Sequence, residues 1–284
     1  MNDAVRPSFR PVLLALAAAL TLPAMAAPAA SAARPPNPCL DASQRKHLRC
    51  PDLVMKRPFG FKLDPFTRPG HLVLRAGNSI DNAGTGPAEL FGVRSGPTSM
   101  NARQRIYRPG GAKRVGVATG AHLFFKYVPN RGRYWKFLHA AAFDLYRLDA
   151  AGKHIARVRR GPKVSYCLRD LVHSRPGRAH SPRKFVYPAC NMSARTRKVK
   201  LGTSVGWSDV YPPAYPEQWI DVTGLRGCFA YVETADPRNG IYESNESNNS
   251  STVVVRLPFK NGRQRCPTAS RTAPDAGSPG NGGY

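Results

Sequence analysis

The chain has 284 residues, 42% of them hydrophobic, and 43 Lys and Arg residues against 17 Asp and Glu give it a formal net charge of +26. This length suits a single domain with flanking tails. So strong a positive charge attracts polyanions and repels cations, although it can also serve only to keep the protein soluble. The basic residues are spread along the chain and no nucleic-acid-binding motif occurs, which argues against specific recognition of nucleic acid.

The chain begins with a pattern typical of a secretory signal peptide. Two arginines precede an apolar stretch, residues 11–22, that is too short to cross a bilayer. Ala24-Met25-Ala26 fits a cleavage site, with residues 31–33 as a second choice. We therefore predict a signal peptide over residues 1–26, a secreted mature protein and no membrane span. The Ala- and Pro-rich segment 27–38 is predicted to be a disordered lead.

The folded part is predicted to span residues 39–266, followed by a low-complexity, disordered tail over 267–284. The 27 prolines and the absence of long helical periodicity favour an all-β fold. Short runs of β-branched and aromatic residues, bounded by Gly, Pro or Asn, indicate strands. We expect a β-sandwich with long loops, stabilised by disulfides. The clearest of these runs are 122–128, 143–148, 219–223, 228–234 and 251–257.

Six cysteines occur, and none forms a Cys-x-x-Cys pair. In an exported protein an even number of cysteines favours disulfides over metal ligands. Six cysteines allow 15 pairings, and only proximity along the chain distinguishes them here. That criterion suggests Cys39–Cys50, Cys167–Cys190 and Cys228–Cys266.

Two segments contain the most informative motifs, GPKVSYCLRD at residues 161–170 and GWSDVYPPAYPEQWIDVTG at residues 206–224. Together they resemble the catalytic domain of lysyl oxidases. In that family a Lys just before a Tyr-Cys-Leu-x-Asp run joins covalently to a Tyr upstream of Gln-Trp-Ile-Asp. The resemblance implies that Lys163 and Tyr211 are the precursors of a lysine tyrosylquinone cofactor. Without the motifs, Lys163 would be interpreted as a solvated lysine, and Tyr211 as a tyrosine of the core or of a loop.

Further segments follow the order expected for the same family. They are PDLV at residues 51–54, SIDNAGTGPAELFG at 79–92 and IYESNESNNSSTVVVRL at 241–257. The similarity thus covers about residues 51–258. It implies a copper- and quinone-dependent enzyme that deaminates a primary amine oxidatively, often a peptidyl lysine, to an aldehyde.

The sequence lacks most of the copper ligands that the resemblance implies. The family holds copper with a short His-x-His-x-His cluster just before a Phe-x-x-Tyr strand, which corresponds here to residues 143–146. A protonated lysine opposes a divalent cation, and a leucine offers no lone pair. The ligand positions are therefore degraded; they hold Tyr134, Lys136 and Leu138.

His139 is the only imidazole left in that segment. His122 could join it in a metal site if their strands are neighbours, although a lone histidine is more often a structural residue. Asp209, two residues before Tyr211, is a candidate general base. Asp170 and Asp221 lie in the same motifs, and each of the three carboxylates can instead cap a turn or pair with an arginine.

Three hypotheses follow. The first is a secreted amine oxidase that uses copper and lysine tyrosylquinone and acts on a primary amine or peptidyl lysine. The second is a non-catalytic cationic protein that uses the same fold to bind an anionic polymer of the cell envelope. The third is a structural role without a specific ligand.

Overall fold

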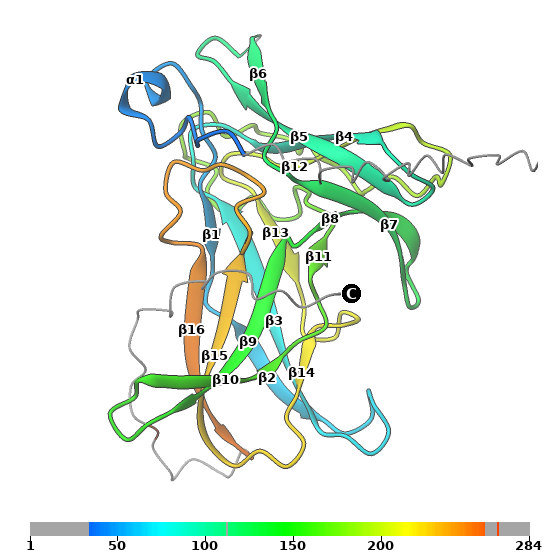
Figure 1. The fold of residues 1–284 in the computed structure, drawn as a ribbon, viewed down its shortest axis with the longest axis vertical. Coiled ribbons are helices and arrows are strands. Elements are labelled where there is room, and N and C mark those ends of the chain that lie inside the picture. The colour runs from blue at the N-terminus through cyan, green and yellow to red at the C-terminus, as the bar shows by residue number, and fades with distance from the viewer. Residues whose placement is uncertain (1–33, 112, 259–265, 267–284) are drawn as a thin grey trace, which may run out of the picture. The chain divides into compact units, whose positions relative to one another are not determined.

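The computed structural model describes residues 34–111, 113–258 and 266, and these are almost entirely strands and loops (Figure 1). The single helix among them, α1 (Ala42–Arg45), has only four residues. No helix in this part of the chain is long and apolar enough to span a membrane. The predicted all-β fold is confirmed.

The predicted signal peptide, 1–26, and the predicted tail, 267–284, lie outside the described residues. Of the predicted lead, residues 34–38 are described. They run along the folded part, where the Arg34 guanidinium donates to the carbonyl oxygens of residues 238 and 239 at 2.8 and 2.9 Å.

Five strands make up the first sheet: β1 (Leu53–Met55), β2 (Phe59–Asp64), β3 (Val73–Asn82), β13 (Ser208–Tyr211) and β14 (Trp219–Asp221). β3 is its centre because all four other strands pair with it. The ten residues of β3 are mostly buried. β3 is a core strand although it contains Asn and Asp, because their side chains are hydrogen-bonded within the protein.

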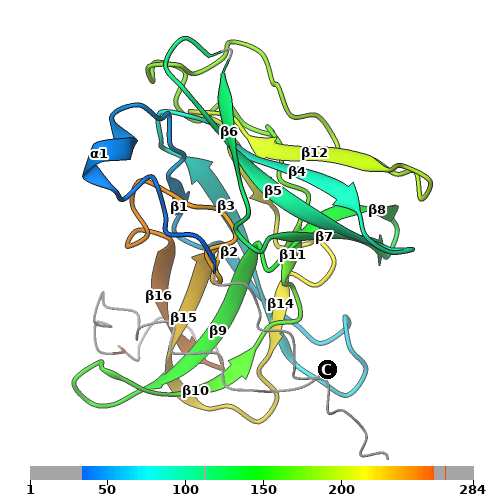
Figure 2. The same cartoon turned by 45° about the horizontal axis from the view of Figure 1, so that its top comes forward.

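The second sheet has four strands: β9 (Ala141–Leu148), β10 (His154–Arg160), β15 (Gly227–Ala235) and β16 (Ser250–Leu257). β15 lies between β9 and β16, and its middle residues are buried on both faces. β10 is an edge strand of largely exposed residues. Figure 2 shows β9, β15 and β16 side by side, with β3 behind them.

The third sheet has seven strands: β4 (Ala88–Arg94), β5 (Ser99–Tyr107), β6 (Arg114–Val117), β7 (His122–Val128), β8 (Gly132–Leu138), β11 (Ser165–Tyr166) and β12 (Lys198–Thr203). Buried and less buried residues alternate along β5, as expected for a strand with one face on the core. All five runs predicted as strands are found, with ends displaced by no more than two residues. Pairing continues past the predicted run in β9, β15 and β16, and it stops two residues short of the run in β14.

Three disulfides stabilise the loops between these sheets, and they join the cysteines closest to each other in the chain: Cys39–Cys50, Cys167–Cys190 and Cys228–Cys266. These are the pairs expected from proximity. Cys167–Cys190 fixes the end of β11 to the long loop that precedes β12, close to Tyr211.

Asp170 organises the same loop from inside. Its Oδ2 accepts from the amides of Val186 and Tyr187 at 2.8 and 3.2 Å and from the Ser204 hydroxyl at 2.7 Å. Its Oδ1 accepts from the Ser204 amide at 2.7 Å. One buried carboxylate thus satisfies three backbone and one side-chain donor that no strand pairs.

Asp170→Asn should lower the free energy of unfolding by about 2–4 kcal/mol, because an amide in this position presents its own N–H groups to donors that need an acceptor. Urea unfolding at neutral pH measures this. Asp149→Asn is the matched control, since Asp149 accepts backbone bonds only in an exposed turn. It should change stability by less than about 1 kcal/mol. Equal losses in the two variants would contradict this role of Asp170.

Candidate functional site

Lys163 and Tyr211, far apart in the sequence, are in contact in the folded protein. Lys163 lies two residues before β11, and the pairing of β11 with β8 carries it into the interior. Tyr211 ends β13, opposite Asn78 of β3. The Nζ atom of Lys163 is 3.9 Å from the centroid of the Tyr211 ring. The two residues singled out by their motifs are therefore neighbours.

Tyrosine rings enclose the Lys163 amine. Nζ lies 4.0 Å from the ring centroid of Tyr215 and 4.5 Å from that of Tyr166. The side chain is fully buried, and among the described residues its Nζ has no hydrogen-bond partner. Burial lowers the pKa of Lys163 well below its ordinary value, and the charge of Lys136 acts in the same direction. The neutral, nucleophilic form of the amine is thereby favoured.

Hydrogen bonds hold the rings around this amine. The Asn78 amide donates to the Tyr166 hydroxyl at 2.7 Å, and the Gln218 amide donates to the Asn78 oxygen at 3.2 Å. The backbone amide of Cys167 donates to the Tyr211 hydroxyl at 3.2 Å. The rings of Tyr166 and Tyr211 meet edge to face, with centroids 4.5 Å apart. The position of Tyr211 is therefore fixed from several elements.

Asp209 differs from the other two carboxylates of these motifs. Asp170 caps a loop, and Asp221 accepts from Arg68 and lies 2.7 Å from His71 Nδ1, which are the structural roles given above as alternatives. Asp209 is fully buried, and within the described part of the chain neither of its oxygens has a partner. Burial raises the pKa of Asp209 well above its ordinary value, against the charges of Arg169, Lys163 and Lys136.

Lys136 is the third buried ionisable group. It lies in β8, where successive side chains point to opposite faces, so Tyr134, Lys136 and Leu138 share one face. Its Nζ is 5.2 Å from the Tyr134 ring centroid and 5.7 Å from that of Tyr215, and the residue is fully buried. Burial lowers the pKa of Lys136 to about 8, and the charge of Lys126 acts in the same direction.

A pocket of about 380 Å³ opens beside Tyr211. The rings of Tyr134 and Tyr215, whose hydroxyls are hydrogen-bonded to each other, form part of its lining. Arg131 and Arg169 also line it, together with the Cys167–Cys190 disulfide and apolar side chains. Tyr211 thus lines a cavity of ligand size, and Lys163 lies behind its ring.

Tyr166, Tyr215, Arg131 and Arg169 were not among the site residues predicted from the sequence. Three of them lie inside the motifs: Tyr166 and Arg169 flank Cys167 in the first, and Tyr215 follows Tyr211 in the second. Their proximity to the predicted residues was the only signal available. Arg131 comes from the turn between β7 and β8, and nothing in the sequence connects that turn to Tyr211.

A family model described as lysyl oxidase matches residues 122–265, just over half of the 284 residues. The chain belongs to the lysyl oxidase family. No curated protein matches it. The matched range contains Lys163, Tyr211 and the positions predicted for copper ligands in this lysyl oxidase family member.

The residues of this family member do not fit a copper ion of the family kind. At the three positions predicted for copper ligands it presents a phenol, a buried lysine amine and an isobutyl group, none of which is a good copper ligand at neutral pH. Among the described residues, no group of three His, Cys, Asp or Glu side chains is placed to hold a metal ion. We therefore derive no step of a reaction through copper.

His139 and His122, the two candidate imidazoles, lie in the same region. His139 follows β8 in a turn with φ of 62°, and His122 begins the neighbouring strand β7. Burial lowers the pKa of the half-buried His139, and the charges of Arg238, Arg160 and His122 act in the same direction. A positively charged environment also disfavours a metal cation. The role of the two histidines as metal ligands remains a prediction.

Lys136→Met should stabilise the protein at pH 7 by about 3 kcal/mol, because the Lys pKa falls from 10.5 to about 8 on folding. The unfolded chain binds more protons between these two values, so the stability of the native protein rises with pH across this window. The advantage of the variant should therefore shrink above about pH 8. Denaturant unfolding at several pH values measures it.

Lys198→Met is the control, because Lys198 is exposed on β12. Its effect on stability should be small and independent of pH. An advantage of Lys136→Met that is the same at every pH would show that the group is not held with a lowered pKa.

Proposed function

We propose that this member of the lysyl oxidase family is a secreted protein that binds an anionic ligand and does not carry out copper-dependent amine oxidation. The observation that carries the proposal is the place of Lys136, fully buried on the face of β8 where the family's copper ligands belong. A lysine there cannot be swung out to solvent without opening the core, so it would oppose copper in every accessible arrangement.

The charge of the protein supports binding over amine oxidation. A net charge of +26 slows the approach of a cationic amine and speeds that of an anion. Polymers of a cell envelope that carry carboxylate or phosphate groups suit such a surface. Three disulfides suit an oxidising compartment, which supports secretion together with the signal-peptide pattern.

In this proposal the buried residues form a wall of the binding site. Lys163 fills the space among three tyrosine rings, and the hydrogen bond from the Cys167 amide fixes Tyr211 at the edge of the pocket. Asp209, whose pKa burial raises, is fully buried on β13 two residues before Tyr211. These residues then orient the lining and exclude water, and no bond of the ligand is broken.

Amine oxidation is the second candidate, and one observation favours it. The Lys163 Nζ lies 3.9 Å from the Tyr211 ring centroid, close enough for a covalent link with little movement of either residue. Asp209 is also a fully buried carboxyl near Tyr211, and burial raises its pKa, which makes its ionised form a stronger base. A cross-link between Lys163 and Tyr211 would favour amine oxidation, and its absence would favour anion binding.

After exposure of the mature protein to copper, a peptide map should recover the Lys163 and Tyr211 peptides separately and unmodified. The reason is that the ligand positions cannot bring copper to the pair. Mass spectrometry of the digest and metal analysis of the dialysed protein provide the measurement. Tyr211→Phe, which cannot form a quinone, is the control and should give an equivalent map. A linked peptide present in the native protein and absent from the control would establish the amine oxidase instead.

A further inference from the structure

The pocket beside Tyr211 has an unusual balance of charge. Arg131 and Arg169 both line it, and no carboxylate does. Neither guanidinium makes a hydrogen bond or an ion pair with any described residue, whereas Arg75, Arg105 and Arg160 each bind a carboxylate. A half-buried guanidinium such as Arg169 has up to five N–H groups to satisfy. An oxyanion in the pocket would satisfy them.

Both guanidinium groups line the pocket and act electrostatically on Tyr134, which lines it too. Arg131 lies with its guanidinium carbon 5.9 Å from the Tyr215 ring centroid. Burial raises the pKa of Tyr134, and the positive charges of Arg131 and Arg169 both act against that rise, so both lie near the same phenol. Tyr134 and Tyr215 are the two rings whose hydroxyls meet. Charge and hydroxyl groups are thus gathered at one end.

The paired hydroxyls add a donor to this end. Two phenols carry two protons, and the hydrogen bond between Tyr134 and Tyr215 uses one of them. The other proton is free to bind an acceptor. Two guanidinium groups and a phenol O–H together suit the planar, bidentate geometry of a carboxylate or a phosphate.

The remainder of the lining is apolar. Leu171, Val210 and Met192 contribute side chains, and Leu171 and Met192 are 38% and 61% exposed, an uncovered apolar surface next to the charged end. The Cys167–Cys190 disulfide forms part of the wall and makes it rigid, which reduces the ordering cost of binding. The lining therefore matches a ligand with an oxyanion head and an apolar or aromatic body.

We propose that this pocket binds a small molecule, or the end group of a polymer, that joins a carboxylate or phosphate to an apolar or aromatic body, with Arg131 and Arg169 holding the oxyanion. This inference rests on the proposed function, because it names the chemistry of the ligand that the protein binds in place of an amine. The cationic substrates of an amine oxidase would be repelled at the same position.

Calorimetric titration with matched probes tests this. Phenylacetate and phenethylamine have the same ring and opposite head charges, and phenyl phosphate distinguishes the two kinds of oxyanion. We expect phenylacetate, phenyl phosphate or both to bind at least about tenfold more tightly than phenethylamine, at concentrations up to about 10 mM. Tighter binding by phenethylamine, or no binding of either anion in this range, would overturn the proposal.

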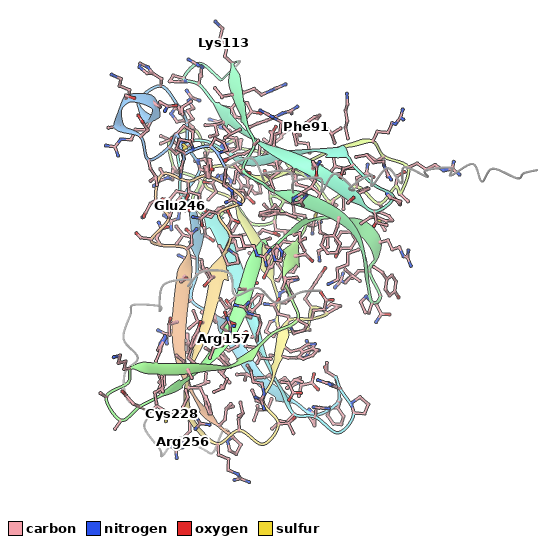
Figure 3. The ribbon with its side chains drawn as sticks, viewed as in Figure 1. Phe91, Lys113, Arg157, Cys228, Glu246 and Arg256 are labelled. Atoms are coloured by element: carbon pink, nitrogen blue, oxygen red, sulfur yellow. A yellow bond between two sulfur atoms is a disulfide. The ribbon has the colours of Figure 1, made fainter. Side chains whose placement is uncertain are left out.

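Variants tie the binding to the two arginines. Arg169→Gln and Arg131→Gln should each weaken the binding of the preferred anion by about tenfold, as expected for the loss of a charge-assisted hydrogen bond. Arg256→Gln is the matched control, on β16 at the lower end of the molecule in Figure 3 and outside the pocket lining. It removes the same net charge and should leave affinity unchanged. If all three variants weakened anion binding equally, the effect would be one of overall charge, and the proposal that the two arginines bind the oxyanion would be wrong.

The variants remain informative if one of them folds poorly. Arg131 is exposed, so Arg131→Gln should keep the unfolding midpoint of the native protein even if Arg169→Gln does not.

The peptide map distinguishes failure of the pocket proposal from failure of the proposed function. Anions that fail to bind in a protein without the Lys163–Tyr211 cross-link would contradict only the pocket, whereas a cross-link together with amine binding would contradict both.

Discussion

Lys136, Lys163 and Asp209 are buried ionisable side chains around the candidate site, and among the described residues none of their charged atoms has a hydrogen-bond partner. Burying an isolated ion costs several kcal/mol, so the interior responds by moving protons. Burial lowers the pKa of both lysines and raises the pKa of Asp209. Burial thus acts against the charged form of each of the three groups, and the neighbouring aromatic rings and Arg169 are arranged around them.

The constraint extends to the strands that carry these groups. β8 brings Lys136, the segment before β11 brings Lys163, and β13 brings Asp209 and Tyr211. The pairing of β11 with β8 and of β13 with β3 holds them in one place. Because the pairs belong to two different sheets, the cluster lies where the sheets meet. A change in any of the three side chains therefore affects the packing between sheets as well as the site.

Much of this arrangement could be predicted from the sequence. Short β-branched and aromatic runs located the strands, because those residues suit a pleated and half-buried surface. The motifs around Lys163 and Tyr211 identified two side chains that do lie together. The pocket could not be predicted, because it is formed by residues that no local pattern connects. Arg131 reaches it from the turn between β7 and β8, where Asn130 and Gly132 have positive φ values of 58° and 83°. Only the folded chain shows that this turn approaches Tyr215.

The same geometry explains why an intact motif need not indicate an active enzyme. Lys163 packs among Tyr166, Tyr211 and Tyr215, and its long side chain fills the volume between their rings. Truncating a fully buried side chain of this size leaves a cavity, which costs several kcal/mol. The rings in turn depend on one another through edge-to-face contacts, with centroids 4.5 and 4.6 Å apart. Packing alone is thus a sufficient reason to keep Lys163 and Tyr211. Tyr134, Lys136 and Leu138, at the positions predicted for copper ligands, fill one face of β8 with side chains of other chemistry, and Lys136 is held there by burial against the rings of Tyr134 and Tyr215.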